Sequence, residues 1–191
     1  MSEEEFVELY SDAHQRLWTL AAAITGDQNT AEDIVQESAI TALKKLDQFA
    51  EGTSFIAWMS QIVRFTALNF LKSARRRRES GLSVHSEAES EPRNSQSRDR
   101  SANLAVTLSG ELVEGQSEFD DEVAAAIGSL DPERRACLLL RTVHQLGYDE
   151  ISEIVGVPEG TAMSHVHRAR TSMRKQLQTD PSGDESRELS S

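Results

Sequence analysis

A long polar segment, residues 79–118, interrupts the apolar pattern of this 191-residue chain. It is rich in Ser, Glu, Arg, Asn and Gln, and only a stretch around residues 104–113 is weakly apolar. Such a segment buries too little apolar surface to offset the entropy of ordering it, so we expect a flexible linker. Residues 178–191 have a similar composition and predict a disordered tail. The remainder should form two small domains, residues 1–78 and 119–177, whose separate cores are marginal.

The first of these domains has helical periodicity throughout. Apolar residues recur at spacings of three and four, starting with Phe6, Leu9, Tyr10, Ala13, Leu17, Leu20, Ala21 and Ile24. We expect Gly26 to end this helix and Asn29 or Thr30 to cap the next. A third helix should open at Thr53 and Ser54. Since no alternating strand pattern appears, the domain is predicted to be all-helical.

The second domain has the spacing of a helix-turn-helix. Asp131 and Pro132 should start a helix, because Pro is tolerated at a first helical position, and we expect Gly147 to close it. A short helix over residues 148–155, a turn over residues 156–160 and a final helix capped by Thr161 follow. The predicted fold is all-α, with two small helical domains joined by a linker and a four-helix second domain.

Charge is distributed unevenly along the chain. The net charge of -12 argues against a nucleic-acid partner, because DNA binding neutralises phosphates with Lys and Arg. Residues 61–78, however, carry six Lys and Arg and no acid, and residues 161–177 carry four and no acid. Two basic patches therefore lie within an acidic chain.

The second basic patch coincides with the final helix of the helix-turn-helix, which in such motifs enters the major groove. If Ala162, Val166, Ala169 and Met173 pack inward, the outer face carries candidate DNA contacts, namely Thr161, Ser164, His165 and Arg168, with His167 and Thr171 as further candidates. The alternative is a solvated amphipathic helix that completes a small bundle. The turn, the small residues and the absence of acids together favour DNA binding.

The first basic patch ends in Arg75, Arg76, Arg77 and Arg78, a run that is weak evidence when taken alone. It follows a segment that carries Phe55, Trp58 and Phe65. Aromatic rings beside cations suit melted DNA, because unstacked bases need flat surfaces. Alternatively Phe55 and Trp58 belong to the core, which helical spacing makes the favoured role for Trp58.

An acidic cluster, Glu32, Asp33, Gln36 and Glu37, follows the first predicted turn. It is either a solvated helix face, the usual meaning of such a cluster, or a docking surface for a basic partner.

The sequence offers little support for an enzyme. The five histidines are scattered, and the chain has no HExxH motif, phosphate-binding glycine loop or nucleophile elbow. Cys137 lacks the companions of a zinc site. We therefore expect no catalysis, no metal and no cofactor. No stretch approaches the roughly 18 apolar residues of a membrane span, and the acidic start is unlike a signal peptide, so a cytoplasmic location without membrane insertion is expected.

Several motifs of the chain carry a family resemblance. They are Asp33, Ile34, Val35, Gln36 and Glu37; Leu46, Asp47, Gln48 and Phe49; Thr53, Ser54 and Phe55 with Trp58; the Arg run; Leu130, Asp131, Pro132 and Glu133; Tyr148, Asp149, Glu150 and Ile151; and Pro158, Glu159, Gly160 and Thr161. In this order they resemble the extracytoplasmic-function class of bacterial sigma factors, the small promoter-recognition subunits of RNA polymerase. The resemblance covers both predicted domains.

The resemblance implies a role for each surface. Asp33, Gln36 and Glu37 match the segment that docks on the coiled coil of the polymerase beta-prime subunit. The segment that opens and recognises the minus-ten element matches Phe49, Phe55, Trp58, Arg64, Phe65 and Asn69, followed by Arg75, Arg76, Arg77 and Arg78. The helix that recognises the minus-thirty-five element matches Thr161, Met163, Ser164, His165, His167 and Arg168. The linker would thread through polymerase.

The chain departs from the family pattern at a few positions. Ala39 stands where an aromatic residue is usual, and Phe65 stands where Asn is common. Met163 and His165 occupy positions that are frequently Lys or Arg. Fewer phosphate contacts and an unusual minus-thirty-five sequence are expected.

The expected partners are core RNA polymerase, through its beta-prime and beta subunits, and promoter DNA. Members of this class are commonly held by anti-sigma proteins, which makes such a protein a further candidate partner. The expected function is promoter-specific transcription initiation. The alternative is a stand-alone helix-turn-helix regulator whose first domain serves dimerisation or sensing.

Overall fold

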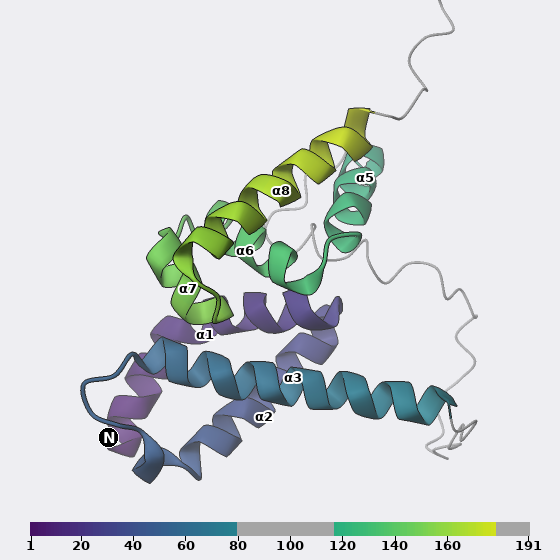
Figure 1. Ribbon diagram of the computed structural model, residues 1–191. Helices are drawn as coiled ribbons and strands as arrows, with labels where there is room; N and C mark the ends of the chain where they lie inside the picture. The colour runs from purple at the N-terminus through teal and green to yellow at the C-terminus, as the bar shows by residue number, and fades with distance from the viewer. Residues whose placement is uncertain (80–116, 179–191) are drawn as a thin grey trace, which may run out of the picture.

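The structure, a computed structural model, describes residues 1–79 and 117–178. Across these residues it contains seven α-helices, one short 3-10 helix and no strand, which confirms the predicted all-α fold (Figure 1). The predicted linker and tail lie almost wholly outside the described residues. None of the helices in the described ranges is long and apolar enough to cross a membrane.

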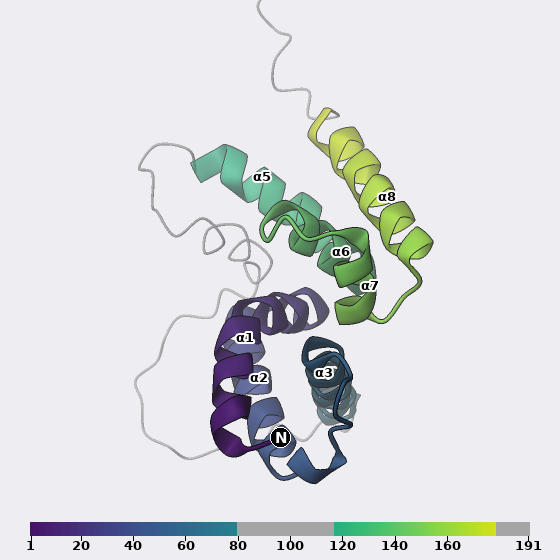
Figure 2. The same ribbon diagram turned by 90° about the vertical axis from the view of Figure 1, so that its left-hand side faces the viewer.

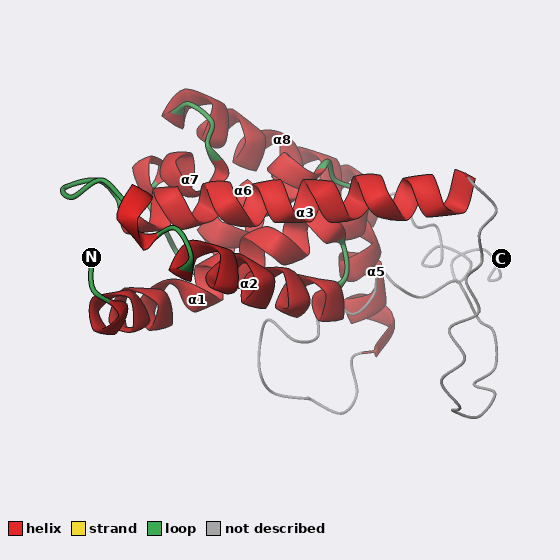
Figure 3. Ribbon diagram, turned by 90° about the horizontal axis from the view of Figure 1, so that it is seen from below, coloured by secondary structure: helices red, strands yellow, loops and turns green. Residues whose placement is uncertain are grey.

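The first half comprises α1 (Glu3–Thr25), α2 (Gln28–Leu43), the 3-10 helix η1 (Leu46–Gln48) and α3 (Phe55–Glu79). Gly26 ends α1 as predicted, with a φ of 71° that favours glycine. The cap of α2 is Asp27 rather than Asn29 or Thr30, because the Asp27 carboxylate accepts from the Thr30 N–H at 2.8 Å. The C-terminal end of α3 extends beyond α1 and α2 (Figure 3).

The second half comprises α5 (Ser117–Gly128), α6 (Pro132–Thr142), α7 (Tyr148–Val155) and α8 (Glu159–Gln178). Gly147 does not close α6, which ends at Thr142; it begins α7 instead, and its N–H donates to Glu150 at 2.8 Å. Thr161 lies inside the first turn of α8 rather than at its cap. The Pro158 carbonyl accepts from the Thr161 N–H at 2.8 Å, so the helix starts earlier than predicted.

The two halves share one continuous apolar core instead of burying two separate ones. Leu17 and Leu20 of α1 belong to the same buried cluster as Cys137 and Leu140 of α6, and all four are almost fully buried. Helix α1 packs against α6 on one side and against α2 and α3 on another, while α7 contacts α3 (Figures 1 and 2). Helix α1 therefore contributes buried side chains to the core of both halves.

Arg135 fixes the connection between α5 and α6. Its side chain is 9% exposed, and one guanidinium nitrogen donates to the carbonyls of Gly128 and Leu130 at 2.8 and 2.9 Å. Burial lowers the pKa of Arg135. The guanidinium also approaches Gly26 so closely that a β-carbon there would lie 3.2 Å from it. Arg135 thus joins the turn before α6 to the end of α1.

Candidate polymerase and nucleic-acid interfaces

The acidic cluster lies on the solvent side of α2. Ile34 and Val35 are buried beneath it, which leaves the side chains of Asp33, Gln36 and Glu37 exposed. Gln36 donates a hydrogen bond to Glu32 at 3.0 Å, one turn back along the helix. Alternation of buried and exposed positions along α2 therefore presents the three predicted docking residues together on one surface.

The exposed face of α2 continues into apolar side chains toward its C-terminal end. Ile40 is 55% exposed and Leu43 is 43% exposed. Ile40 and Leu43 therefore add apolar surface at the margin of the acidic face, which a partner protein docked there would bury.

A groove of about 710 Å³ runs between α2 and α3. Its lining combines acidic, basic, amide and aromatic groups, namely Glu37, Thr41, Lys45, Gln48, Trp58, Gln61, Ile62, Phe65, Thr66, Asn69, Phe70 and Ser73. Phe65 is 69% exposed, and Asn69 is exposed one turn further along α3. The groove thus offers an accessible aromatic ring beside amide groups that can donate and accept hydrogen bonds.

The other aromatic residues predicted to bind minus-ten DNA pack on one another. The ring centroids of Phe49 and Trp58 lie 5.3 Å apart, and Phe55 contacts both of these rings and Phe6. Phe55 is 8% exposed. The structure therefore places Phe55 in the core, the alternative that its helical spacing had allowed, while Trp58 is half-buried and also lines the groove.

The basic end of α3 is exposed. Arg75, Arg76 and Arg77 present their side chains to solvent, and a shallow hollow at Asn69, Lys72, Ser73, Arg75 and Arg76 continues from the groove. The side chain of Arg78 lies outside the described residues.

Arg64 differs from the rest of this basic track, because it points toward the second half. Its guanidinium donates to the backbone carbonyl of Val155 at the end of α7. Partial burial lowers the pKa of Arg64, and the charge of Glu133 on α6 opposes this shift. The predicted minus-ten contact is thus engaged within the chain.

Helix α8 presents most of its predicted DNA contacts outward. Ala162, Val166 and Ala169 are buried, as predicted, and Met163, Ser164, His167 and Arg168 are exposed, while Thr161 is half-buried. Figures 1 and 2 both place α8 at the edge of the second half, away from α2. The outer face of α8 is therefore open to a ligand as large as duplex DNA.

His165 does not share this outer face. Its side chain is only 15% exposed, and its Nε2 lies 3.6 Å from a carboxylate oxygen of Glu133 on α6. In this arrangement His165 faces the junction of the two halves rather than the solvent. The sequence pattern missed this because it depends on where α6 and α3 lie.

The residues that join the halves carried no recognisable sequence signal. His144 and Glu153 belong to no motif, and their partners Thr19 and Ser54 lie far away along the chain. Within residues 1–79 and 117–178, no group of three or more His, Cys, Asp or Glu side chains could hold a metal ion.

Two family descriptions match the chain. Sigma-70 region 2 matches residues 9–77, and Sigma-70 region 4 matches residues 120–173. The first match covers the helices that carry the acidic face and the basic track. The second covers the helix-turn-helix.

Several curated proteins are similar over most of the chain. The ECF RNA polymerase sigma factor SigE of Mycolicibacterium smegmatis is 32% identical over 91% of this chain, which spans 61% of that protein. The ECF RNA polymerase sigma-E factor of Salmonella typhimurium is 33% identical, with 76% of this chain and 73% of that protein covered. SigW of Bacillus subtilis is 27% identical, with 91% and 87% covered.

A solved structure shares the fold. The sigma factor RpoE of Bartonella quintana, determined in complex with the anti-sigma factor NepR, matches 93% of this chain and 99% of its own with a TM-score of 0.58 and 23% identity.

An all-helical fold with a region 2 match, a region 4 match and a helix-turn-helix defines a sigma-70 family protein. The chain belongs to the extracytoplasmic-function class of RNA polymerase sigma factors, and it acts as a sigma factor that directs transcription. This family consists of transcription regulators rather than enzymes.

Proposed function

We propose that the exposed faces of α2, α3 and α8 each bind a different partner during promoter recognition. The acidic face of α2 binds core polymerase, the groove and basic end of α3 bind the minus-ten element, and the outer face of α8 binds the minus-thirty-five element. The observation that carries this assignment is that the chain, with a net charge of -12, presents its acid-free basic segments on α3 and α8. An average charge this negative would otherwise repel DNA.

The acidic face suits a basic protein surface. Asp33 and Glu37 supply charge and Gln36 supplies an amide, and all three are exposed. Charges of this kind at an interface mainly set the encounter rate and the choice of partner, while adjacent apolar groups such as Ile40 contribute buried area. The coiled coil of the beta-prime subunit is the partner that the family resemblance implies.

The groove beside α3 suits an unpaired base. Phe65 offers an exposed ring on which a base can stack, a contact that contributes about 1–3 kcal/mol per base in other proteins. Asn69 can donate to and accept from a base edge. Arg76 and Arg77 lie further along the same helix, where they can hold the phosphates of the same strand.

The face of α8 suits duplex DNA. Ser164 is exposed in the second turn of this helix, near the end that reaches base edges in a helix-turn-helix, and His167 and Arg168 are exposed one turn further along. The Ser164 hydroxyl already donates to the Gly160 carbonyl at 2.9 Å, so its oxygen remains as an acceptor for DNA. Arg174 is exposed further along and is a candidate phosphate contact.

The proposed activity requires no chemistry from this chain. The chain binds, orients and separates the promoter strands, and the polymerase makes the phosphodiester bonds. It would act in the bacterial cytoplasm, where core polymerase and the chromosome are found. The beta subunit and an anti-sigma protein remain candidate partners by family resemblance.

The test is transcription in a reconstituted system. Purified core polymerase should produce specific runoff transcripts from selected promoter sequences only when this chain is added. A stand-alone helix-turn-helix regulator would instead bind its promoter tightly by itself. Tight binding without stimulation of core polymerase would contradict the proposal.

A further inference from the structure

Helix α7 and the loop before it hold the second half against α1. An oxygen of Glu150 lies 4.0 Å from a guanidinium nitrogen of Arg16, and the His144 ring nitrogen Nε2 lies 2.8 Å from the Thr19 hydroxyl. Arg16 and Glu150 are both partly exposed, so their ion pair contributes little by itself. The shared apolar core behind them provides the main attraction between the halves.

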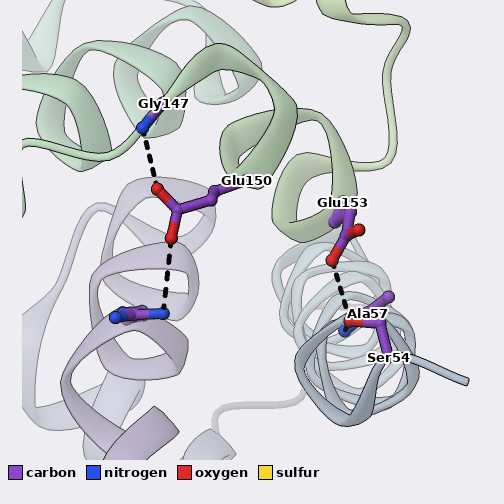
Figure 4. A network of polar contacts seen from close by, with 6 residues as sticks. Ser54, Ala57, Gly147, Glu150 and Glu153 are labelled. Atoms are coloured by element: carbon purple, nitrogen blue, oxygen red, sulfur yellow. Dashed lines mark hydrogen bonds and ion pairs between the residues drawn. The ribbon is translucent and has the colours of Figure 1, made fainter.

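The same short helix also engages α3, at its N-terminal end. The Ser54 hydroxyl donates to the Glu153 carboxylate at 2.8 Å, and its oxygen accepts from the Ala57 N–H at 3.3 Å (Figure 4). Glu153 therefore sets a negative charge at the start of α3, where the helix dipole favours an anion.

The end of α7 and the turn that follows it engage α3 about three turns further along this helix. Arg64 donates to the carbonyl of Val155, and its guanidinium occupies the space that a β-carbon on Gly156 would need. Gly156 has a φ of 71°, a conformation that also favours glycine. The backbone of the turn can thus approach Arg64 as closely as it does only because position 156 has no side chain.

These contacts resemble those that a DNA strand would make with α3. A hydroxyl donor, a helix N-terminus and a guanidinium are groups that proteins use to bind phosphates. In this structure, a carboxylate and a carbonyl oxygen from the second half take up the Ser54 hydroxyl and the Arg64 guanidinium. The groups lie on the helix that we assign to the minus-ten element.

The distance between the two promoter elements is incompatible with the contact between the two halves. Elements centred at minus ten and minus thirty-five are about 25 base pairs apart, or roughly 85 Å at about 3.4 Å per base pair. The turn that precedes α8 contacts α3 directly here. Helices α3 and α8 cannot occupy both elements while this contact persists.

We propose that the contact of α7 and the following turn with α3 is autoinhibitory. Glu153 and the Val155 carbonyl compete with the promoter strand for α3, and the second half must leave α3 before the minus-ten element can bind. This proposal rests on the proposed function, because it takes α3 as the strand-binding helix. It predicts that closure of the two halves lowers DNA affinity even without core polymerase.

The test links the halves reversibly in the full chain. Arg16→Cys and Glu150→Cys place two thiols on the exposed pair between α1 and α7, outside the surfaces assigned to DNA or polymerase. A bismaleimide with an internal disulfide joins them, and reduction releases them. Cys137 can stay in place, because it is fully buried and burial raises its pKa to about 12. The reduced sample is the matched control for the linked one.

The main measurement is the affinity of a fluorescent single-stranded oligonucleotide at low salt. The linked chain should bind about tenfold more weakly than the same chain after reduction, because linkage removes the open population. Equal affinity in the two samples, including equally undetectable binding, would overturn the proposal. Runoff transcription with the reduced chain tests the proposed function separately. Absence of a specific transcript would contradict that function, while the oligonucleotide comparison would still decide whether the contact between the halves is autoinhibitory.

A second pair of variants tests the competing carboxylate itself. Glu153→Ala should tighten oligonucleotide binding about threefold, in keeping with the modest strength of exposed charged contacts. Asp149→Ala removes the same charge from the same helix, and none of the described contacts joins it to the first half, so it should have a smaller effect. An equal gain from both variants would show that general charge rather than the contact is responsible.

Discussion

His144 is a histidine held neutral at the junction of the two halves. The Thr19 hydroxyl donates to the Gln15 carbonyl at 2.9 Å, so its oxygen accepts from the Nε2–H of His144. Burial lowers the pKa of His144, and the nearby charge of Arg16 lowers it further. Glu150, from α7, lies near the same arginine. The environment therefore favours the uncharged ring.

This shift predicts a pH dependence of stability. Between the lowered folded pKa and the unfolded value of about 6.5, the unfolded chain binds more protons, so stability falls as the pH drops through this range. We expect urea unfolding to show a smaller loss of stability between about pH 7.5 and 5.5 for His144→Gln than for the parent chain. His167→Gln, on the exposed face of α8, is the control and should leave the loss unchanged.

Phe65 is the exposed aromatic residue that we expect to influence promoter choice. Its ring is 69% exposed beside the groove, and the family resemblance implies Asn as the common residue at its position. Replacing stacking by hydrogen bonding should change which base is preferred rather than abolish binding. Promoter selection with Phe65→Asn holoenzyme should therefore yield a changed minus-ten consensus, with the minus-thirty-five consensus kept. An unchanged minus-ten consensus would remove Phe65 from recognition.

At the scale of single elements, α2 should determine the affinity for polymerase. Reversing the charge at Asp33 and Glu37 should weaken core binding about tenfold or more, because like charges would then face a basic partner. Both side chains are exposed, so the thermal midpoint should hardly change. The matched control reverses Glu8 and Asp12, which are exposed on α1. Equal loss in both pairs, or none in the first, would contradict the docking assignment.

Helix α8 should determine the salt dependence of promoter binding. Arg168→Ala in the holoenzyme should lower promoter affinity and flatten the plot of log affinity against log salt by about one unit, if Arg168 neutralises one phosphate. Anisotropy over a salt series measures this slope. A lower affinity with an unchanged slope would assign Arg168 to a base or to the packing of the helix.

Most elements of this fold can be predicted from sequence, and their ends less well. Helix α7 was predicted at its observed residues, because its apolar spacing lies between two glycines. The cap of α2 was missed, since Asp27, Asn29 and Thr30 are all suitable cap residues and only the backbone selects Asp27. Gly147 was misassigned for a similar reason: a glycine between two helices can end one or begin the next.

The direction of individual side chains was harder to predict wherever the two halves meet. Arg64 and His165 both lie on faces that helical periodicity leaves open to solvent, yet both turn toward residues of another helix. Phe55 is buried because the ring of Phe6 on α1 and the ring of Phe49, directly after η1, pack against it. Periodicity within one helix contains no information on such partners, which lie up to a hundred residues away along the chain.

For the whole molecule, charge predicts dependence on polymerase. The chain alone, with a net charge of -12, should bind duplex promoter at least about 100-fold more weakly than the holoenzyme at physiological salt, because acidic surfaces surround its two basic ones. Anisotropy with and without core polymerase measures the difference. Comparable affinities would favour the stand-alone regulator.

The packing of α1 against both halves also has a consequence for folding during synthesis. During synthesis, α1, α2 and α3 leave the ribosome before α6 has been made. The apolar side of α1 that packs with Ala136 and Cys137 in the finished fold is therefore exposed to solvent at first. At a synthesis rate of about 5–20 residues per second, this apolar surface stays exposed for on the order of ten seconds before α6 can pack on it. A nascent sigma factor of this kind therefore passes through a period in which chaperones, or the polymerase itself, can reach it first.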